Sequence, residues 1–245
     1  MTLCRSLATA ALALNATVLP LAAVAQTSAV PAVPAPVAHS APLISRKTAT
    51  VAGILFAATL LSDRSLRMEA QEHRGTTSNA MASLGNSFGE WSYVVPGLAA
   101  GYLAGEIAGS SGLKRIVVRA GASAALAGGL STALKYTVGR SRPSVAGDPD
   151  QFRPFTRWNS FPSGHTAVAF AIATAIADET RDPWTDAALY GAATLTALSR
   201  VNDDRHWTSD VLIGGLLGHL SAKWVSQKLG PVQVVPGGVV GKIEF

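Results

Sequence analysis

Apolar side chains gather in six long segments that are separated by shorter polar stretches. The segments cover residues 48–61, 91–108, 116–136, 166–177, 184–198 and 207–224. Each is too long for an ordinary strand and is rich in Ala and Leu rather than in β-branched residues, which indicates helices. The more charged stretch 62–90 is expected to hold a surface helix and a loop. The pattern therefore predicts an all-α protein built as a six-helix bundle.

The two ends of the chain differ from this central part. Residues 1–25 combine Arg5, an apolar stretch and a final Ala-Val-Ala, which is typical of a secretory signal peptide, although an uncleaved anchor helix is the alternative. Residues 26–46 form an Ala/Pro-rich linker, in which the prolines disfavour helix. The helical domain is expected at 47–228. In the C-terminal tail, 229–245, two Val-rich runs flank Pro-Gly-Gly, a pattern that predicts a small hairpin.

Composition narrows the class of protein. Among the 245 residues 14% are charged, against about 25% in soluble domains, so the chain is expected at or in a membrane. The net charge of +5 favours anionic partners such as phosphates or acidic lipid surfaces. Nucleic acid is not favoured, because basic residues form no tract and do not alternate with aromatic ones. The single cysteine, Cys4, lies within the predicted signal and excludes a disulfide or a cysteine metal site in the mature chain.

A histidine and an aspartate near the last apolar segment provide a candidate nucleophile. His206 and Asp210 are four residues apart and would share one face of a helix. A carboxylate there can accept one ring N–H and leave the other nitrogen free to attack. The pair alone is more often an ordinary contact on a helix surface.

Two further blocks supply groups that bind anions and transfer protons. Ser163 and Gly164 precede an apolar helix, whose first N–H groups can bind an anion, and His165 could protonate a leaving group. Lys135 and Arg142 follow a long apolar segment, and an arginine can grip two phosphate oxygens with its planar fork. Each block alone is equally consistent with helix capping.

Nearby charged residues have simpler interpretations. Arg200 completes the set of cations. Arg140, between Lys135 and Arg142, is expected to be solvated, and residues 203–205 are expected to line the loop before His206. These groups can hold and attack a tetrahedral oxyanion without a metal or another cofactor, so none is expected.

Taken together, the three blocks resemble a known family signature. Lys-x6-Arg-Pro, Pro-Ser-Gly-His and Ser-Arg-x5-His-x3-Asp, in that order, are similar to the signature of the type 2 phosphatidate phosphatase/vanadium haloperoxidase superfamily. The positions are Lys135, Arg142, Pro143, Pro162, Ser163, Gly164, His165, Ser199, Arg200, His206 and Asp210. The resemblance covers roughly residues 48–224 and agrees with a six-helix plan.

The resemblance implies roles for the matching residues. His206 would attack phosphorus and form a phosphohistidine, with Asp210 in support. His165 would protonate the leaving oxygen and then help water to hydrolyse the intermediate. The phosphate oxygens would be held by Lys135, Arg142, Ser163, Gly164 and Arg200.

Three activities fit this implied chemistry. The first is a phosphatase of lipid phosphates, acting on phosphatidate, phosphatidylglycerophosphate or a polyprenyl (pyro)phosphate, which the apolar helices favour. The second is an exported acid phosphatase of small soluble phosphomonoesters, which the signal-like start and the linker favour. The third is a vanadium haloperoxidase, which no feature of the sequence favours.

Two features of the sequence conflict on how the helices are placed relative to a membrane. Segments 48–61 and 166–177 fall short of the roughly 20 residues that a span needs. A cleaved signal followed by six crossings would put Lys135 and Arg142 in the cytoplasm. The basic pairs Arg46-Lys47 and Lys114-Arg115 instead favour a site that faces outward. We expect an enzyme of the bacterial envelope with its site in the periplasm and its bundle in or on the inner membrane; a soluble periplasmic enzyme is the alternative.

Overall fold

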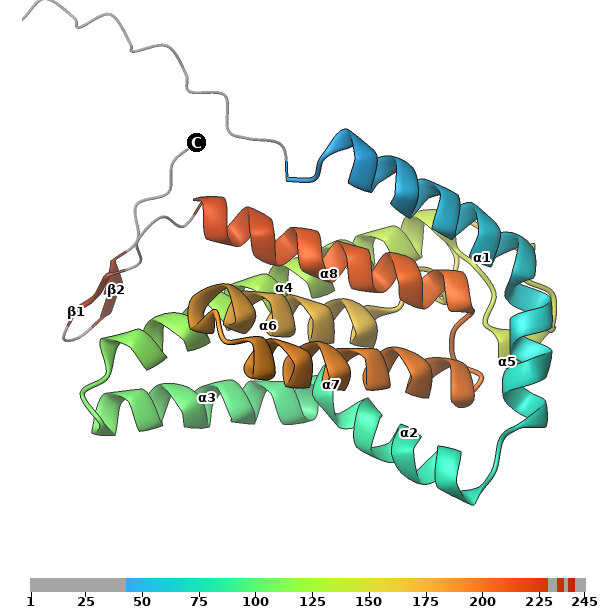
Figure 1. Cartoon of the computed structure of the whole chain (residues 1–245). Helices are drawn as coiled ribbons and strands as arrows, with labels where there is room; N and C mark the ends of the chain where they lie inside the picture. Colours follow the sequence, from blue (N-terminus) through green and yellow to red (C-terminus); the bar gives the residue numbers. More distant parts are fainter. Residues whose placement is uncertain (1–42, 229–232, 236–237, 241–245) are drawn as a thin grey trace, which may run out of the picture. The chain divides into compact units, whose positions relative to one another are not determined.

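The computed structural model describes residues 43–228, 233–235 and 238–240. The predicted signal peptide and nearly all of the linker lie outside these residues. The helices are α1 Arg46–Glu72, α2 Thr76–Gly89, α3 Trp91–Ile107, α4 Ser111–Val138, α5 Pro143–Ala146, α6 Gly164–Thr180, α7 Pro183–Asn202 and α8 Thr208–Lys228 (Figure 1). The tail contributes β1, Gln233–Val235, which pairs antiparallel with β2, Gly238–Val240, as the predicted hairpin requires.

The all-α class is confirmed for the bundle at residues 43–228, whereas the count of six helices is not. Each apolar segment lies within a helix, to within one residue at its ends, but the stretch 62–90 supplies the C-terminal part of α1 and the whole of α2. A single turn, α5, is added after α4. The first segment, expected to be too short to span a membrane, belongs to a helix of 27 residues that is long and apolar enough to cross one by length and composition alone.

Local signals in the sequence explain where the helices begin and end. The side chains of Ser45, Ser110 and Asp182 accept hydrogen bonds from the first turns of α1, α4 and α7. Gly139 ends α4 in the left-handed region at φ 60°, where a side chain would be strained. A Cβ at Gly139 would also lie 1.9 Å from the carbonyl oxygen of Arg153, so there is no room for a side chain at this turn.

Small residues allow the central helices to pack closely. Helix α6 packs against α4 and α8 through clusters of buried alanines, among them Ala120 with Ala175 and Ala222, and Ala127 with Ala167. Gly214 and Gly218 bring α8 against the backbone of α6, where a Cβ would lie 2.5 Å from Ser163 O and 2.2 Å from Ala167 O respectively. These pairs show that α6 runs parallel to α8 and antiparallel to α4. The start of α6, the start of α8 and the end of α4 therefore meet at one end of the bundle.

Helix α1 contributes little to this core. Its N-terminal half exposes large apolar side chains, with Ile54 63% and Leu61 88% exposed. By length and composition, α1 and α4 are the two helices in the described part of the chain that could cross a membrane. An apolar helix that the protein does not cover requires another apolar environment.

Two glycine substitutions test the close packing of α6 against α8. Gly218→Ala should lower the free energy of unfolding by about 1–3 kcal/mol, because the new methyl group meets backbone atoms that cannot move aside. The matched substitution Gly191→Ala in α7, where nothing lies within 4 Å of a Cβ, should stabilise by up to about 1 kcal/mol. Thermal unfolding in detergent measures both, and equal midpoints for the two variants would contradict the packing described.

Candidate active site

All the residues predicted for the site lie at the end of the bundle where α4 ends and α6 and α8 begin. They come from the last turn of α4, the segment before α5, the start of α6, the last turn of α7 and the approach to α8. The residues are Lys135, Arg142, Ser163, Gly164, His165, Arg200, His206 and Asp210. The structure thus brings together three blocks that are separated by up to 75 positions along the chain.

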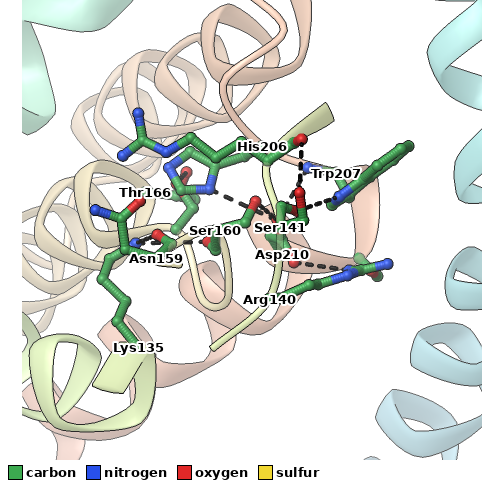
Figure 2. A network of polar contacts seen from close by, with 12 residues as sticks. Lys135, Arg140, Ser141, Asn159, Ser160, Thr166, His206, Trp207 and Asp210 are labelled. Carbon is green, nitrogen blue, oxygen red and sulfur yellow. Dashed lines mark hydrogen bonds and ion pairs between the residues drawn. The ribbon is translucent and has the colours of Figure 1, made fainter. Parts of the chain in front are cut away.

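His206 and Asp210 face each other in the buried part of the site. The Nδ1 of His206 lies 3.6 Å from Oδ2 of Asp210 (Figure 2). The histidine is 3% exposed and the aspartate 0%. The expectation that both share a helix face was wrong in one respect, because His206 precedes α8 and only Asp210 lies in its first turn. Apart from Asp210, no group in the described part of the chain lies near enough to Nδ1 to pair with it.

Asp210 is held by several donors at once. Its Oδ2 accepts hydrogen bonds from Ser160 Oγ at 2.5 Å and from the Trp207 backbone N–H at 3.0 Å. Its Oδ1 accepts from Arg140 Nη1 at 2.8 Å. The backbone carbonyl of Asp210 accepts from the N–H of Ser163, which ties α8 to the Ser-Gly-His turn. The carboxylate orientation is therefore fixed on both oxygens.

The expectation that Arg140 is solvated was wrong. Arg140 is 0% exposed and lies between two buried carboxylates, with Nη2 2.8 Å from Asp63 Oδ2 and Nη1 2.8 Å from Asp210 Oδ1. Its Nε donates to the carbonyl of Pro149 at 2.9 Å. Its guanidinium also lies 5.4 Å from the ring centre of the buried Trp207. Arg140 thus belongs to the buried frame of the site.

His165 also has a carboxylate partner, which the sequence did not indicate. Glu90, at the junction of α2 and α3, lies with Oε2 2.7 Å from His165 Nε2. Gly89 allows this approach, because a Cβ there would lie 2.3 Å from the carbonyl oxygen of His165. Each of the two site histidines therefore faces a carboxylate.

The three predicted cations surround the histidines. Lys135 donates from Nζ to the carbonyl of Asn159 at 2.5 Å (Figure 2). Arg200 donates from Nη1 to Asn86 Oδ1 at 2.6 Å. The buried Nε atoms of Arg142 and Arg200 have no hydrogen-bond partner within the residues that the structure describes. Buried guanidinium donors of this kind suit a bidentate oxyanion.

Burial and neighbouring charges lower the pKa of both histidines. For His206 burial is the largest cause, and Lys135 and Arg200 add to it while Asp210 opposes it, which brings the pKa to about 4. The pKa of His165 is also lowered, first by burial and then by Arg200, while Glu90 acts in the opposite direction. At neutral pH His206 is therefore uncharged and able to act as a nucleophile.

Helix α1 reaches the site through three polar residues spaced one turn apart. Asp63 accepts from Ser209, Arg67 pairs with Asp204 at 2.7 Å and 2.8 Å, and Gln71 donates to the carbonyls of residues 201 and 202. The spacing of four residues puts them on one face of the helix. This stripe was not among the features expected from the sequence, although its spacing of four residues can be read there. Asn86 and Glu90 carried no such signal. In the described part of the chain no cluster of three or more His, Cys, Asp or Glu is suited to a metal.

The stretch that holds the three motifs matches a known family. Residues 116–231 match the family model described as PAP2 superfamily. Lipid A 1-phosphatase from Porphyromonas gingivalis is 44% identical over 107 residues, which are 42% of this chain and 22% of the relative. The match thus spans about a fifth of that protein. The resemblance stated from the sequence is confirmed at the level of the superfamily.

Two solved structures have the same fold. LpxE from Aquifex aeolicus aligns with a TM-score of 0.54 and 22% identity over 66% of this chain and 93% of its own. A transmembrane PAP2 type phosphatidylglycerolphosphate phosphatase from Bacillus subtilis aligns with a TM-score of 0.54 and 20% identity over 73% of this chain and 94% of its own.

The electrostatic environment of His206 can be measured directly. Lys135→Met should raise the pKa of His206, because it removes a nearby positive charge, and Asp210→Asn should lower it by removing a negative one. NMR titration of ¹⁵N-labelled histidines in the wild type and in each variant checks both. Shifts of the same sign in the two variants would contradict the charge arrangement described.

Proposed function

Residues 116–231 belong to the PAP2 superfamily, and from this premise we propose that the protein is a metal-independent phosphatase of lipid phosphates that works through a phosphohistidine. The observation that carries the proposal is the gathering of three cations around two histidines, each of which faces its own carboxylate. Phosphoryl transfer needs positioning and charge stabilisation more than covalent chemistry from the protein, and these groups supply both.

His206 is the nucleophile in this proposal. Its Nδ1 faces Asp210, so the carboxylate selects the tautomer with the proton on Nδ1 and leaves Nε2 to attack phosphorus. As the N–P bond forms, the bond to the leaving oxygen breaks and the ring becomes cationic. Asp210 stabilises that cation. The 3.6 Å separation is expected to shorten when substrate binds, because catalytic hydrogen bonds are often long in the free enzyme.

The cations hold the phosphoryl group during the transfer. Lys135, Arg142 and Arg200 neutralise the equatorial oxygens, over which the transition state spreads its charge. The Ser163 hydroxyl and the first N–H groups of α6 add neutral donors at a helix start.

His165 transfers the protons. It gives a proton to the leaving oxygen in the first step, and in the second it takes one from the water that attacks the phosphohistidine. Inorganic phosphate is then released and His206 returns to its neutral form. Glu90 stabilises the protonated form of His165, which the first step consumes and the second step restores.

The substrate class is supported by the relatives and by the apolar helices. The lipid A 1-phosphatase of P. gingivalis shares 44% identity across the matched segment, and α1 presents an uncovered apolar surface next to the site. We therefore favour an amphiphilic phosphate monoester over a small soluble one. The same helices support a location in or on the inner membrane, with the site facing the periplasm as the basic pairs at the starts of α1 and α4 favour.

The activity can be tested in a single assay series. Phosphate release in EDTA from detergent-solubilised phosphatidate, from lipid A and from an aryl phosphate should depend on His206, with His206→Ala at least about 10³-fold slower in kcat. His73→Ala is the matched control and should keep full activity, since His73 is exposed and contacts Glu69 rather than a site residue. Faster turnover of the aryl phosphate than of either lipid would favour the small-substrate alternative. No release that depends on His206 would overturn the proposal.

The role of Glu90 predicts a shift in the pH profile. Burial, followed by Arg200, lowers the pKa of His165, and Glu90 acts in the opposite direction. Glu90→Gln removes the group that raises it, so the alkaline limb of kcat/KM should move to lower pH. The acid limb, set by His206, should stay in place. Ionisation of the substrate affects the pH profiles of the wild type and of Glu90→Gln equally, so it does not change the difference between them. An unchanged alkaline limb would contradict this role for Glu90.

A further inference from the structure

We propose that Asp63 on α1 is a positioning residue for the phosphatase reaction, because together with Arg140 it fixes the orientation and the negative potential of Asp210 and thus of His206. This inference rests on the function proposed above. Asp63 lies 147 positions before Asp210 in the sequence and belongs to none of the three motifs.

Every polar contact of Asp63 is made to the frame that holds the nucleophile. Its Oδ1 accepts the backbone N–H of Ser209 at 2.9 Å, and its Oδ2 accepts from Arg140 Nη2 at 2.8 Å and from the Ser209 hydroxyl. The side chain is 0% exposed. A buried carboxylate with these partners acts on the groups that it contacts, because it is not in contact with solvent.

The contact with Ser209 anchors the start of α8. The first N–H groups of a helix have no acceptor within that helix. Asp63, on α1, supplies the acceptor for the N–H of Ser209 in α8. Ser209 lies between His206 and Asp210, within three residues of the first and next to the second. Movement of this turn would change the distance between His206 Nδ1 and Asp210 Oδ2.

Arg140 transmits the effect to the carboxylate of Asp210. Its guanidinium contacts Asp63, Ser209 and Asp210 with its two terminal nitrogens, while Nε is occupied by the carbonyl of Pro149. The Oδ1 of Asp210 is held by this fork, so Oδ2 is directed toward His206. Lysine, with a single nitrogen, cannot make these contacts together.

Charge explains why a second carboxylate is present. Arg140 with Asp210 alone is a neutral pair, which offers little attraction to the cation that forms on His206. Asp63 leaves the group of three with a net charge of −1, opposite to that of the phosphorylated imidazolium ring. In a buried site this charge acts through a low effective dielectric. Asp63 therefore offsets the charge of Arg140, so that Asp210 can stabilise the intermediate.

The experiment compares Asp63→Asn with Glu72→Gln. Both remove a carboxylate charge from α1 without changing the size of the side chain, but Glu72 is exposed at the end of the helix. Asp63→Asn should lower kcat about 10- to 100-fold, the range seen when a group that orients a reacting residue is removed. KM and the inhibition constant of inorganic phosphate should change less than about threefold, since the cations remain. Glu72→Gln should match the wild type.

A double-mutant cycle separates positioning from stability. In the Asp210→Asn background, Asp63→Asn should cost less than about threefold in kcat, because the group through which it acts is already lost. Independent, multiplicative losses would overturn the inference, as would full activity of Asp63→Asn. If Asp63→Asn fails to fold, Arg140→Lys takes its place, and the same loss of kcat and the same lack of additivity are expected. A fully active Arg140→Lys variant would then overturn the inference.

A titration keeps this inference separate from the proposed function. The charged groups that face His206 are Lys135 from α4, Arg200 from α7 and Asp210 from α8, with Arg140 and Asp63 behind the last. Removing the charge of Asp63 should lower the pKa of His206 in the NMR experiment, whether or not the assay releases phosphate. A wild-type enzyme without His206-dependent phosphate release would overturn the function. An active wild type with Asp63→Asn unchanged in kcat and in titration would overturn only the role of Asp63.

Discussion

The ion group Asp63–Arg140–Asp210 is the constraint on which the site depends. Placing three charges where none is exposed costs several kcal/mol per ion unless each finds good partners, and here all four carboxylate oxygens and all three guanidinium nitrogens have them. Loss of one member would leave the others buried without compensation. The group joins α1, the segment after α4 and α8, and so it determines where the loop with His206 lies.

The helix packing provides the geometry that this ion group needs. Because α6 is so rich in alanine, and Gly214 and Gly218 remove side chains from α8, the two helices lie close enough for the carbonyl of Asp210 to accept the N–H of Ser163. The Ser-Gly-His turn and the helix that carries Asp210 are thus parts of one packed unit. The main effect of packing small residues here is to fix the position of the site, and the apolar area that they bury is of less importance.

The sequence predicted the parts of the site that are local. Helix propensity and apolar periodicity located every long apolar helix, and fixed spacing identified the two histidines, the three cations and Asp210. It did not predict residues whose role depends on contacts distant in the sequence. Arg140 looked like one more exposed base, because its partners Asp63 and Asp210 lie 77 and 70 positions away. Glu90 approaches His165 only because the junction of α2 and α3 folds back across 75 positions. Nor could hydrophobicity alone find the end of α1, where the apolar pattern stops but the helix continues.

The continuation of α1 has a physical reason that unites its two halves. The N-terminal half carries exposed apolar residues such as Ile54 and Leu61, suited to an apolar environment. The C-terminal half carries Asp63, Arg67 and Gln71 along one face, and these contact the start of α8, the loop between α7 and α8, and the end of α7 respectively. A helix that contacted only the bilayer would have no need of this stripe, and a purely structural helix would bury its apolar half. The same rigid element therefore links the surface where an amphiphilic substrate would reside to the loop that holds His206.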